Sequence, residues 1–144
     1  MRFEFSAGGI VYRKSPKLQV LVCQHSQHHG WVFPKGLIGD KEKGEKKEET
    51  AVREVKEETG IEAEIEKALT PSEYWYQWEG EKVKKTVYFF IMRYIAGDTK
   101  DHDFEMEKVE WIDYNDVFNR LTYPSDKKIW DKARKLIASK GGVA

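Results

Sequence analysis

The sequence predicts an α/β fold, a mixed β-sheet sandwiched between α-helices, built as one domain over residues 1–144. The chain of 144 residues is 40% hydrophobic and 13% aromatic, which is enough apolar material for a single core. Segments with strand-like alternation are interleaved with segments of helical spacing. Their order lacks the regular strand–helix repetition of an all-parallel sheet, so we expect a mixed sheet.

The first part of the chain predicts three strands. Their expected ranges are 3–12, Leu18–Gln24 and Trp31–Phe33. The pair Gly8-Gly9 makes a bulge plausible within the first strand. A turn at Ser15-Pro16 is expected to join the first two strands, and Pro34 should end the third.

A helix is predicted from Lys46 to Thr59, after a glycine-rich and charged loop over Lys35–Gly44. The helical stretch contains neither glycine nor proline, and Gly60 stands at the expected C-cap position. At 100° per residue, the apolar side chains of Ala51, Val52 and Val55 fall on one side, so we expect them to face the core.

The remainder predicts four more strands and two more helices. The strands are expected at Glu62–Leu69, Glu73–Trp78, Lys84–Tyr94 and Val109–Ile112, with a turn at Glu79-Gly80-Glu81. The helices are expected at Asp113–Arg120 and Asp126–Ser139. The second should bury the apolar residues that recur at helical spacing, namely Ile129, Trp130, Ala133, Leu136 and Ile137. The tail, residues 140–144, is expected to fray.

Composition argues against several classes of protein. The net charge is zero, and the sequence has no basic stripe that would indicate a stable nucleic-acid partner, although balanced total charge does not exclude a local positive pocket. The longest apolar run, Val87–Met92, is too short to cross a bilayer, and the N-terminus is unlike a signal peptide. The single cysteine, Cys23, excludes an internal disulfide and is expected to be a buried thiol. We therefore expect a cytoplasmic protein with no membrane contact, as a monomer or homodimer.

Three carboxylates recur along the predicted helix. Glu54, Glu57 and Glu58 are spaced i, i+3 and i+4, which places them on one face about 5–6 Å apart. Their mutual repulsion would be relieved by a hard divalent cation such as Mg²⁺, which also keeps waters and phosphate oxygens as ligands. A solvated acidic face is the alternative. Arg53 and Glu45 favour a built site, because an ion pair between them would orient the cluster.

These residues resemble the Nudix family. The pattern Gly39-x5-Glu45-x7-Arg53-Glu54-Val55-x-Glu57-Glu58-x-Gly60-Ile61 matches the Nudix box at each defined position, and Phe5–Gly9 and Trp31–Gly36 also fit. The similarity covers roughly residues 3 to 139. It implies the Nudix fold and hydrolysis of a diphosphate linkage in a nucleotide derivative. It also implies Mg²⁺ as cofactor, with Mn²⁺ as a possible substitute.

The resemblance assigns expected roles within the box. Glu54, Glu57 and Glu58 would hold metal, with Glu54 or Glu57 acting on the attacking water, while Glu45 and Arg53 form the orienting pair. The first box glycine is either Gly39 or Gly36, and we favour Gly36 with a three-residue insertion after it. Its carbonyl would be a backbone metal ligand.

A further carboxylate is expected from the later acidic segment. Its candidates are Glu105, which we favour, and then Asp103 and Glu107. A solvated acidic loop is the alternative for this segment.

Substrate contacts are expected on the hairpin after the box. The segment around Tyr74, Tyr76 and Lys85 resembles diadenosine polyphosphate hydrolases, which stack a tyrosine on adenine. Strand alternation places Tyr74, Tyr76 and Trp78 on one face, so that Trp75 can pack on the other. A purely structural aromatic ladder is the alternative.

The remaining candidate contact is Lys35, which would face the phosphates. His25, His28 and His29 are expected in a polar loop near the site mouth.

The leading functional interpretation is a small-molecule nucleotide hydrolase that splits diadenosine tetraphosphate, or a longer homologue, into ATP and a second nucleotide. Removal of oxidised nucleoside triphosphates and hydrolysis of RNA 5′ pyrophosphate are alternatives on the same scaffold. A non-catalytic nucleotide-binding module is a further alternative. It is disfavoured because all three box carboxylates are present.

Overall fold

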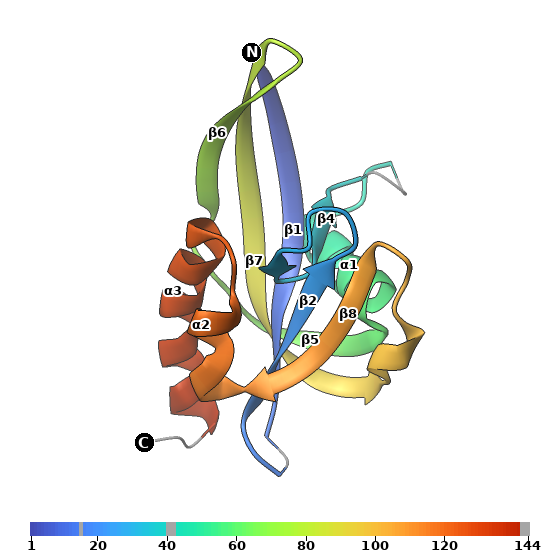
Figure 1. The fold of residues 1–144 in the computed structure, drawn as a ribbon, viewed down its shortest axis with the longest axis vertical. Helices are drawn as coiled ribbons and strands as arrows, with labels where there is room; N and C mark the ends of the chain where they lie inside the picture. Colours follow the sequence, from blue (N-terminus) through green and yellow to red (C-terminus); the bar gives the residue numbers. More distant parts are fainter. Residues whose placement is uncertain (15, 40–42, 142–144) are drawn as a thin grey trace.

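The computed structural model describes residues 1–14, 16–39 and 43–141. They form an eight-stranded mixed sheet packed between helices, as expected from the sequence (Figure 1). The strands are β1 Arg2–Arg13, β2 Gln19–His25, β3 Trp31–Val32, β4 Lys35–Leu37, β5 Ile61–Ala68, β6 Ser72–Trp78, β7 Glu81–Gly97 and β8 Met106–Asp113. The α-helices are α1 Lys47–Thr59, α2 Val117–Arg120 and α3 Pro124–Gly141, with 3₁₀ turns at η1 Thr99–Asp101 and η2 Tyr114–Asp116.

The long strands β1 and β7 form the centre of the sheet. They run parallel over a continuous register from Arg2↔Val83 to Tyr12↔Arg93. The main path is β3-β2-β1-β7-β5, with β4 on β1, β6 on β7 and β8 on β2. The other pairings are antiparallel, so the sheet is mixed.

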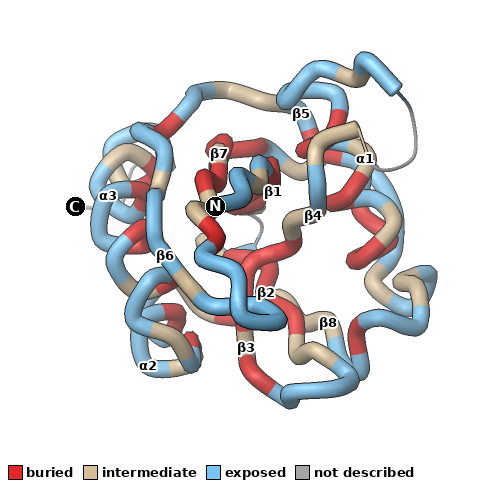
Figure 2. Tube along the Cα trace, turned by 90° about the horizontal axis from the view of Figure 1, so that it is seen from above, coloured by how far each residue is buried: buried red, intermediate tan, exposed pale blue. Residues whose placement is uncertain are grey.

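Two hydrophobic clusters lie on opposite faces of this sheet, because successive strand residues point to opposite sides. Ile10, Val20 and Ile91 face α2 and α3, where they pack with Trp130 and its helical neighbours. The residues that alternate with them, including Val11, Leu21 and Met92, pack against Ala51 and Val55 of α1. Figure 2 shows the buried parts of β1, β2 and β7 between α3 on one side and α1 on the other.

Helix α1 confirms the predicted helix and its ends. The carboxylate of Glu49 accepts a hydrogen bond from the Lys46 N–H at 3.0 Å, as in a capping box. At the other end Gly60 has φ 78°, the left-handed conformation that favours glycine, and its N–H bonds to the Lys56 carbonyl at 2.8 Å. Ala51 and Val55 are buried as expected, but Val52 is 37% exposed and faces away from the core.

The predicted turn between β6 and β7 is present, and it contains Glu79 and Gly80. Both residues have positive φ, 50° and 77°, as a type I′ hairpin turn requires. Figure 1 shows this hairpin rising with the start of β1 above the helical layers. The aromatic segment predicted to contact substrate therefore lies on a projecting part of the sheet.

Several boundaries differ from the expectations. No bulge interrupts β1 at Gly8-Gly9, and the glycines instead permit close approach, since a Cβ at Gly8 would lie 2.2 Å from the Pro34 carbonyl oxygen. The expected loop over Lys35–Gly44 contains strand β4. The helix expected over Asp113–Arg120 is a 3₁₀ turn followed by the short α2, because the Asp113 carboxylate accepts from the Asn115 N–H and starts a tight turn.

The C-terminal helix α3 is longer than expected and buries most of the predicted apolar residues, with Leu136 partly buried. Cys23 is fully buried, as predicted. The turn residue Ser15 and the last tail residues, 142–144, lie outside the described residues. Within the described ranges, no helix is long and apolar enough to span a membrane.

Candidate active site

Glu45 and Arg53 form the ion pair expected from their spacing. Arg53 Nε and Nη2 donate to the two oxygens of Glu45 at 2.8 and 2.9 Å, a bidentate pair. The Thr50 hydroxyl donates to the same carboxylate at 2.6 Å. These hydrogen bonds lower the pKa of Glu45 to about 2, so this carboxylate is ionised whenever the protein is folded near neutral pH.

Arg53 also reaches along α1 toward the acidic cluster. Its Nη1 donates to both oxygens of Glu57, at 3.1 and 3.2 Å, and lies 3.6 Å from Glu54 Oε1. Hydrogen bonds donated to Glu45 and Glu57 keep the pKa of Arg53 above its usual range. The guanidinium therefore fixes the orientation of the carboxylates on the exposed side of the cluster.

Glu54 and Glu58 are buried acids, with 6% and 3% of their surfaces exposed. Strand β4 brings Gly36 directly against Glu54, so that a Cβ at this glycine would lie 1.5 Å from Glu54 Oε2. Gly39 has a different partner, because its backbone hydrogen bond goes to Glu45. Of the two candidate glycines, Gly36 is the one beside the buried carboxylates.

The charge at Glu58 is poorly compensated. Its Oε1 accepts a hydrogen bond from the Lys35 N–H at 3.3 Å. Burial, followed by the charges of Glu54 and Glu105, raises the pKa of Glu58 to about 9. Two buried oxygen-donor groups that repel each other suit a hard divalent cation, so the residues fit Mg²⁺.

The fit requires ligands beyond the side chains. In the part of the chain that the structure describes, no three acidic, histidine or cysteine side chains are grouped so as to hold an ion by themselves. Mg²⁺ normally keeps several waters or phosphate oxygens as ligands, so this arrangement is compatible with it.

The acidic segment after η1 lies beside the end of α1. The Asp103 N–H donates to the Glu57 carbonyl at 3.0 Å, and the Ser26 N–H donates to the Glu105 carbonyl at 3.0 Å. Glu107 is engaged elsewhere, since its Oε1 lies 2.7 Å from His29 Nδ1. Glu105 is near enough for its charge to raise the pKa of Glu58, which makes it the candidate best placed to join the cluster.

The predicted substrate contacts divide into two groups. Lys35 and Tyr74 line a cavity beside the carboxylates. Tyr76 and Lys85 instead share Glu4, which accepts from the Tyr76 hydroxyl and lies 3.5 Å from Lys85 Nζ. The roles assigned to all of these residues remain predictions.

The predicted histidine loop borders this cavity, whereas Trp75 does not pack as expected. Of the predicted histidine loop, His28 lines the cavity and stacks on His25 at a ring separation of 4.2 Å. Trp75 was expected to pack, but it is 48% exposed and lies beneath the ammonium groups of Lys82 and Lys84, at 4.7 and 5.7 Å from the ring centroid.

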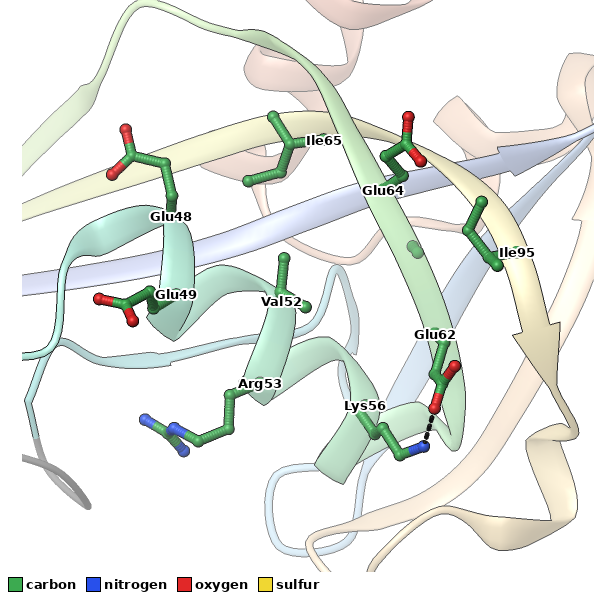
Figure 3. Close-up of a pocket in the computed structure, with 10 residues that line it drawn as sticks. Glu48, Glu49, Val52, Arg53, Lys56, Glu62, Glu64, Ile65 and Ile95 are labelled. Carbon is green, nitrogen blue, oxygen red and sulfur yellow. Dashed lines mark hydrogen bonds and ion pairs between the residues drawn. The ribbon is translucent and has the colours of Figure 1, made fainter.

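A separate hollow of about 860 Å³ lies between the other side of α1 and β5 (Figure 3). Val52 and Ile65 form part of its apolar floor, and a 2.5 Å hydrogen bond joins Lys56 to Glu62 at its edge. On the helical wheel this side of α1 is opposite to Glu54 and Glu58. The hollow therefore lies on a different side of the helix from Glu54 and Glu58, and Arg53 borders both places.

One candidate residue was missed by the sequence reasoning. Asp126, in the first turn of α3, lines the same cavity as Lys35 and Tyr74 and is 8% exposed. An acid at this position has a common explanation, the favourable interaction with a helix N-terminus. Only the fold reveals that its carboxylate is buried beside the site.

Comparison with known proteins identifies relatives along most of the chain. The NUDIX domain model matches residues 3–137. MutT4 of Mycobacterium tuberculosis is 39% identical over 107 residues, 74% of this chain and 42% of that protein. The asymmetrical bis(5′-nucleosyl)-tetraphosphatase of Rattus norvegicus is 33% identical over 148 aligned positions, 93% of this chain and 95% of that protein. The chain spans less than half the length of its mycobacterial relatives.

Solved structures show the same fold. The crystal structure of the mutator MutT protein from Bacillus halodurans has a TM-score of 0.75 and 26% sequence identity, over 91% of this chain and 82% of that one. The sheet between two helical layers is therefore an architecture already known in experimental structures.

Proposed function

The chain belongs to the Nudix family of hydrolases, which act on nucleoside diphosphate derivatives, and from this premise we propose that it hydrolyses a phosphoanhydride bond in a nucleotide with the help of Mg²⁺. The observation that carries the proposal is the pair of buried acids, Glu54 and Glu58, held beside the backbone of Gly36. Burying two carboxylates that repel each other is costly, so their retention at one position favours a metal-dependent role.

The chain's own groups have distinct parts in this reaction. Glu54 and Glu58, together with Glu57, Glu105 and the Gly36 carbonyl, would hold the metal. A bound Mg²⁺ supplies polarisation of the phosphoryl oxygens and a more acidic attacking water.

The groups around the metal ligands orient them and handle the proton. Glu54 or Glu57 accepts the proton of the attacking water, and the Glu45–Arg53 pair keeps the helix face oriented. Lys35 contributes positive charge toward the phosphate chain.

The substrate we favour is diadenosine tetraphosphate or a longer homologue, split asymmetrically into ATP and a second nucleotide. Two features support it. The similarity to the rat bis(5′-nucleosyl)-tetraphosphatase extends over nearly the full length of both chains. The cavity beside Lys35 also has aromatic walls, including Tyr74 and Phe89, on which a base can stack.

A second candidate substrate is a nucleoside triphosphate, which would be cleaved to a monophosphate and pyrophosphate. The similarity to the 8-oxo-(d)GTP phosphatase of Mycolicibacterium smegmatis, 25% identical over 134 residues, supports this alternative. The products separate the two reactions, because only a dinucleotide yields ATP. Product analysis by anion-exchange chromatography, with a panel of dinucleotides, triphosphates and 5′-triphosphorylated RNA, therefore decides among them.

Glu54→Gln and Glu58→Gln test the metal-dependent reaction. Each should reduce kcat by at least about a hundredfold, because a neutral amide binds Mg²⁺ weakly and cannot accept the proton of water. Each should also reduce the rise in Tm that Mg²⁺ produces in the wild-type protein, since a ligand bound only by the folded state stabilises it. Glu48→Gln, on the other side of α1, is the matched control and should leave both quantities unchanged.

The proposal fails if the wild-type protein turns over no member of the panel with Mg²⁺ or Mn²⁺. Binding of nucleotides without turnover would indicate a non-catalytic module. Near-normal turnover by Glu54→Gln would remove Glu54 from the metal and base roles. A Mg²⁺-dependent rise in Tm that survives both substitutions would place the metal elsewhere.

A further inference from the structure

The side of the β6–β7 hairpin that faces away from the cavity beside Lys35 carries large exposed side chains. Successive strand residues point to opposite sides of a sheet, so Tyr74 points toward that cavity and Trp75 points away from it. The hairpin and the start of β1 project above the helical layers (Figure 1). Trp75 is exposed on this projecting part, so it belongs to a surface that the fold leaves open.

Strand pairing places two phenylalanines on the same side as Trp75. Phe3 of β1 and Trp75 of β6 are both paired with Lys84 of β7, so the three residues form one row across the sheet. Phe5 lies two residues further along β1 and therefore points to the same side. Both phenylalanines are exposed. The rings of Phe3, Phe5 and Trp75 together form what we call the aromatic face.

Lysines of β7 lie within the aromatic face. The ammonium groups of Lys82 and Lys84 lie 4.7 and 5.7 Å from the centroid of the Trp75 ring. Lys84 also pairs with Glu73 of β6 at 3.3 Å. Two positive charges therefore meet one negative charge on these rows of the sheet.

More lysines lie at the root of the hairpin. A hollow of about 490 Å³ is lined there by Phe5 and Tyr88, together with Lys46 and Lys47 at the start of α1. The Lys47 ammonium lies 5.7 Å from the centroid of the Tyr88 ring and 3.5 Å from the Glu48 carboxylate. The pattern of aromatic rings beside ammonium groups therefore continues from the hairpin to α1.

Exposed aromatic rings interleaved with lysines match the chemistry of a single-stranded nucleic acid. Every base has a π face that stacks on an aromatic ring, and its phosphates pair with ammonium groups. The bases of a duplex are already stacked and paired, so they cannot reach the rings. A second copy of this chain is a poorer complement, because a twofold contact would bring the lysines of one copy against those of the other.

We propose that the aromatic face is a binding surface for single-stranded nucleic acid. Bases stack on Phe3, Phe5 and Trp75, and the ammonium groups of Lys82 and Lys84 pair with phosphates. Because lysine stems are flexible, the phosphates draw both ammonium groups away from the Trp75 ring and free it for a base. A strand bound here lies on the opposite side of the hairpin from the cavity and requires no hydrolysis.

The test measures the binding of a single-stranded oligoadenylate of about a dozen nucleotides. The probe has a 5′-hydroxyl end and a fluorophore at its 3′ end, so it contains no phosphoanhydride that the carboxylate cluster could cleave. Fluorescence anisotropy in the presence of EDTA gives Kd at several salt concentrations. The wild-type protein should bind the single strand at least about tenfold more tightly than the same strand annealed to oligouridylate.

Trp75→Ala should raise Kd at least about fivefold, as the loss of one stacking ring predicts. Trp78→Ala is the matched control, because Trp78 is also exposed on β6 but points to the opposite side, and it should leave Kd within about twofold. Phe3→Ala is the second test variant. It should also raise Kd, and it decides the matter if Trp75→Ala does not fold.

The salt dependence tests the phosphate contacts separately. Replacing Lys82 and Lys84 together by Gln should reduce the slope of log Kd against log salt concentration by about 1.4, since each contact with a single strand contributes about 0.7. Lys132→Gln, at an exposed position of α3, should leave the slope unchanged.

Three outcomes overturn the inference. The first is a wild-type protein that does not bind the single strand, or binds the duplex as tightly. The second is an equal effect of Trp75→Ala and Trp78→Ala. The third is a dimer in light scattering that Trp75→Ala dissociates, which would make the aromatic face a contact between copies. None of them bears on the proposed hydrolysis, because the probe is not cleaved and a protein that cleaves no nucleotide can still bind it.

Discussion

Burial of an ionised carboxylate lowers the stability of the protein that carries it, and Asp126 is only 8% exposed. Its pKa is about 6 in the folded protein and 3.8 as an ordinary value, so folding disfavours the charged form. Such costs persist where a residue serves a ligand and not the fold. The size of the cost at this residue can be measured directly from the pH dependence of stability.

Asp126→Asn should stabilise the protein at neutral pH by up to about 3 kcal/mol, the free energy that corresponds to the shift in pKa. Because the folded-state pKa is raised, the wild-type protein loses stability as the pH rises from about 4 to about 6. The gain in the variant should therefore be fully present above about pH 6, shrink as the pH falls to about 4, and vanish below that, where Asp126 is protonated in both states.

Thermal unfolding of both proteins at several pH values checks this expectation. The difference in Tm at neutral pH should be several degrees for a domain of this size. Asp131→Asn, at an exposed position of α3, should show no such pH-dependent difference. A variant that is less stable than the wild type at neutral pH would mean that a donor within the protein already satisfies Asp126.

At the scale of elements, the contact between β4 and α1 creates the carboxylate cluster. Strand β4 pairs with β1 through Ala7↔Gly36, and this pairing presses the backbone of Gly36 against Glu54. Helix α1 also packs on β1. The position of the carboxylate cluster therefore depends on two contacts with β1, the pairing of β4 and the packing of α1. A side chain at Gly36 would separate β4 from the helix.

Gly36→Ala should therefore disrupt the cluster more than its small size suggests. The added Cβ would lie 1.5 Å from Glu54 Oε2, so the carboxylate must move. We expect a loss of at least about tenfold in kcat and a weaker Mg²⁺-dependent rise in Tm, since misplacing a reacting group by about 1 Å can cost a hundredfold.

Leu37→Ala is the control for this substitution, because Leu37 is the next residue of β4 and is 42% exposed. It should leave kcat and the response to Mg²⁺ close to those of the wild-type protein. Equal effects of the two substitutions would show that β4 matters as a whole and that the contact at Gly36 has no special role.

Local signals explain which elements could be predicted. The helix α1 has its cap and its apolar spacing within its own sequence, and the hairpin turn at Glu79-Gly80 depends on two adjacent residues. Strand β4 is three residues long and owes its conformation to pairing with β1, which no local pattern reveals. The tight turn after Asp113 interrupts a stretch whose spacing alone resembles one helix.

The same distinction applies to the candidate site. The box carboxylates follow from spacing on α1, and the Glu45–Arg53 pair follows from the position of Glu45 just before that helix; the structure brings them together. Asp126 could not be found in this way, since its burial depends on β6 and β7. The hydrogen bond from the Tyr76 hydroxyl to Glu4 also could not be predicted from spacing, because the two residues are distant in sequence.

At the scale of the whole molecule, the site extends across both layers that flank the sheet. The carboxylates belong to α1 on one face, whereas Asp126 lies in the first turn of α3 on the other. Lys35, in the short strand between them, contacts both regions. Because β1, β2 and β7 contribute residues to both hydrophobic clusters, the two halves of the site should fold and unfold together.

Trp130→Ala tests this coupling, because Trp130 is 2% exposed in the cluster beneath α3. The free energy of unfolding should fall by about 3–5 kcal/mol, from the lost burial and the cavity left behind. Far-UV circular dichroism and tryptophan fluorescence should still report one coincident transition, and the Mg²⁺-dependent rise in Tm should persist. Trp75→Ala, at an exposed tryptophan, should cost less than about 1 kcal/mol. Two separate transitions in Trp130→Ala would show that the α1 layer is stable without the α3 layer, and that the two halves of the site are independent.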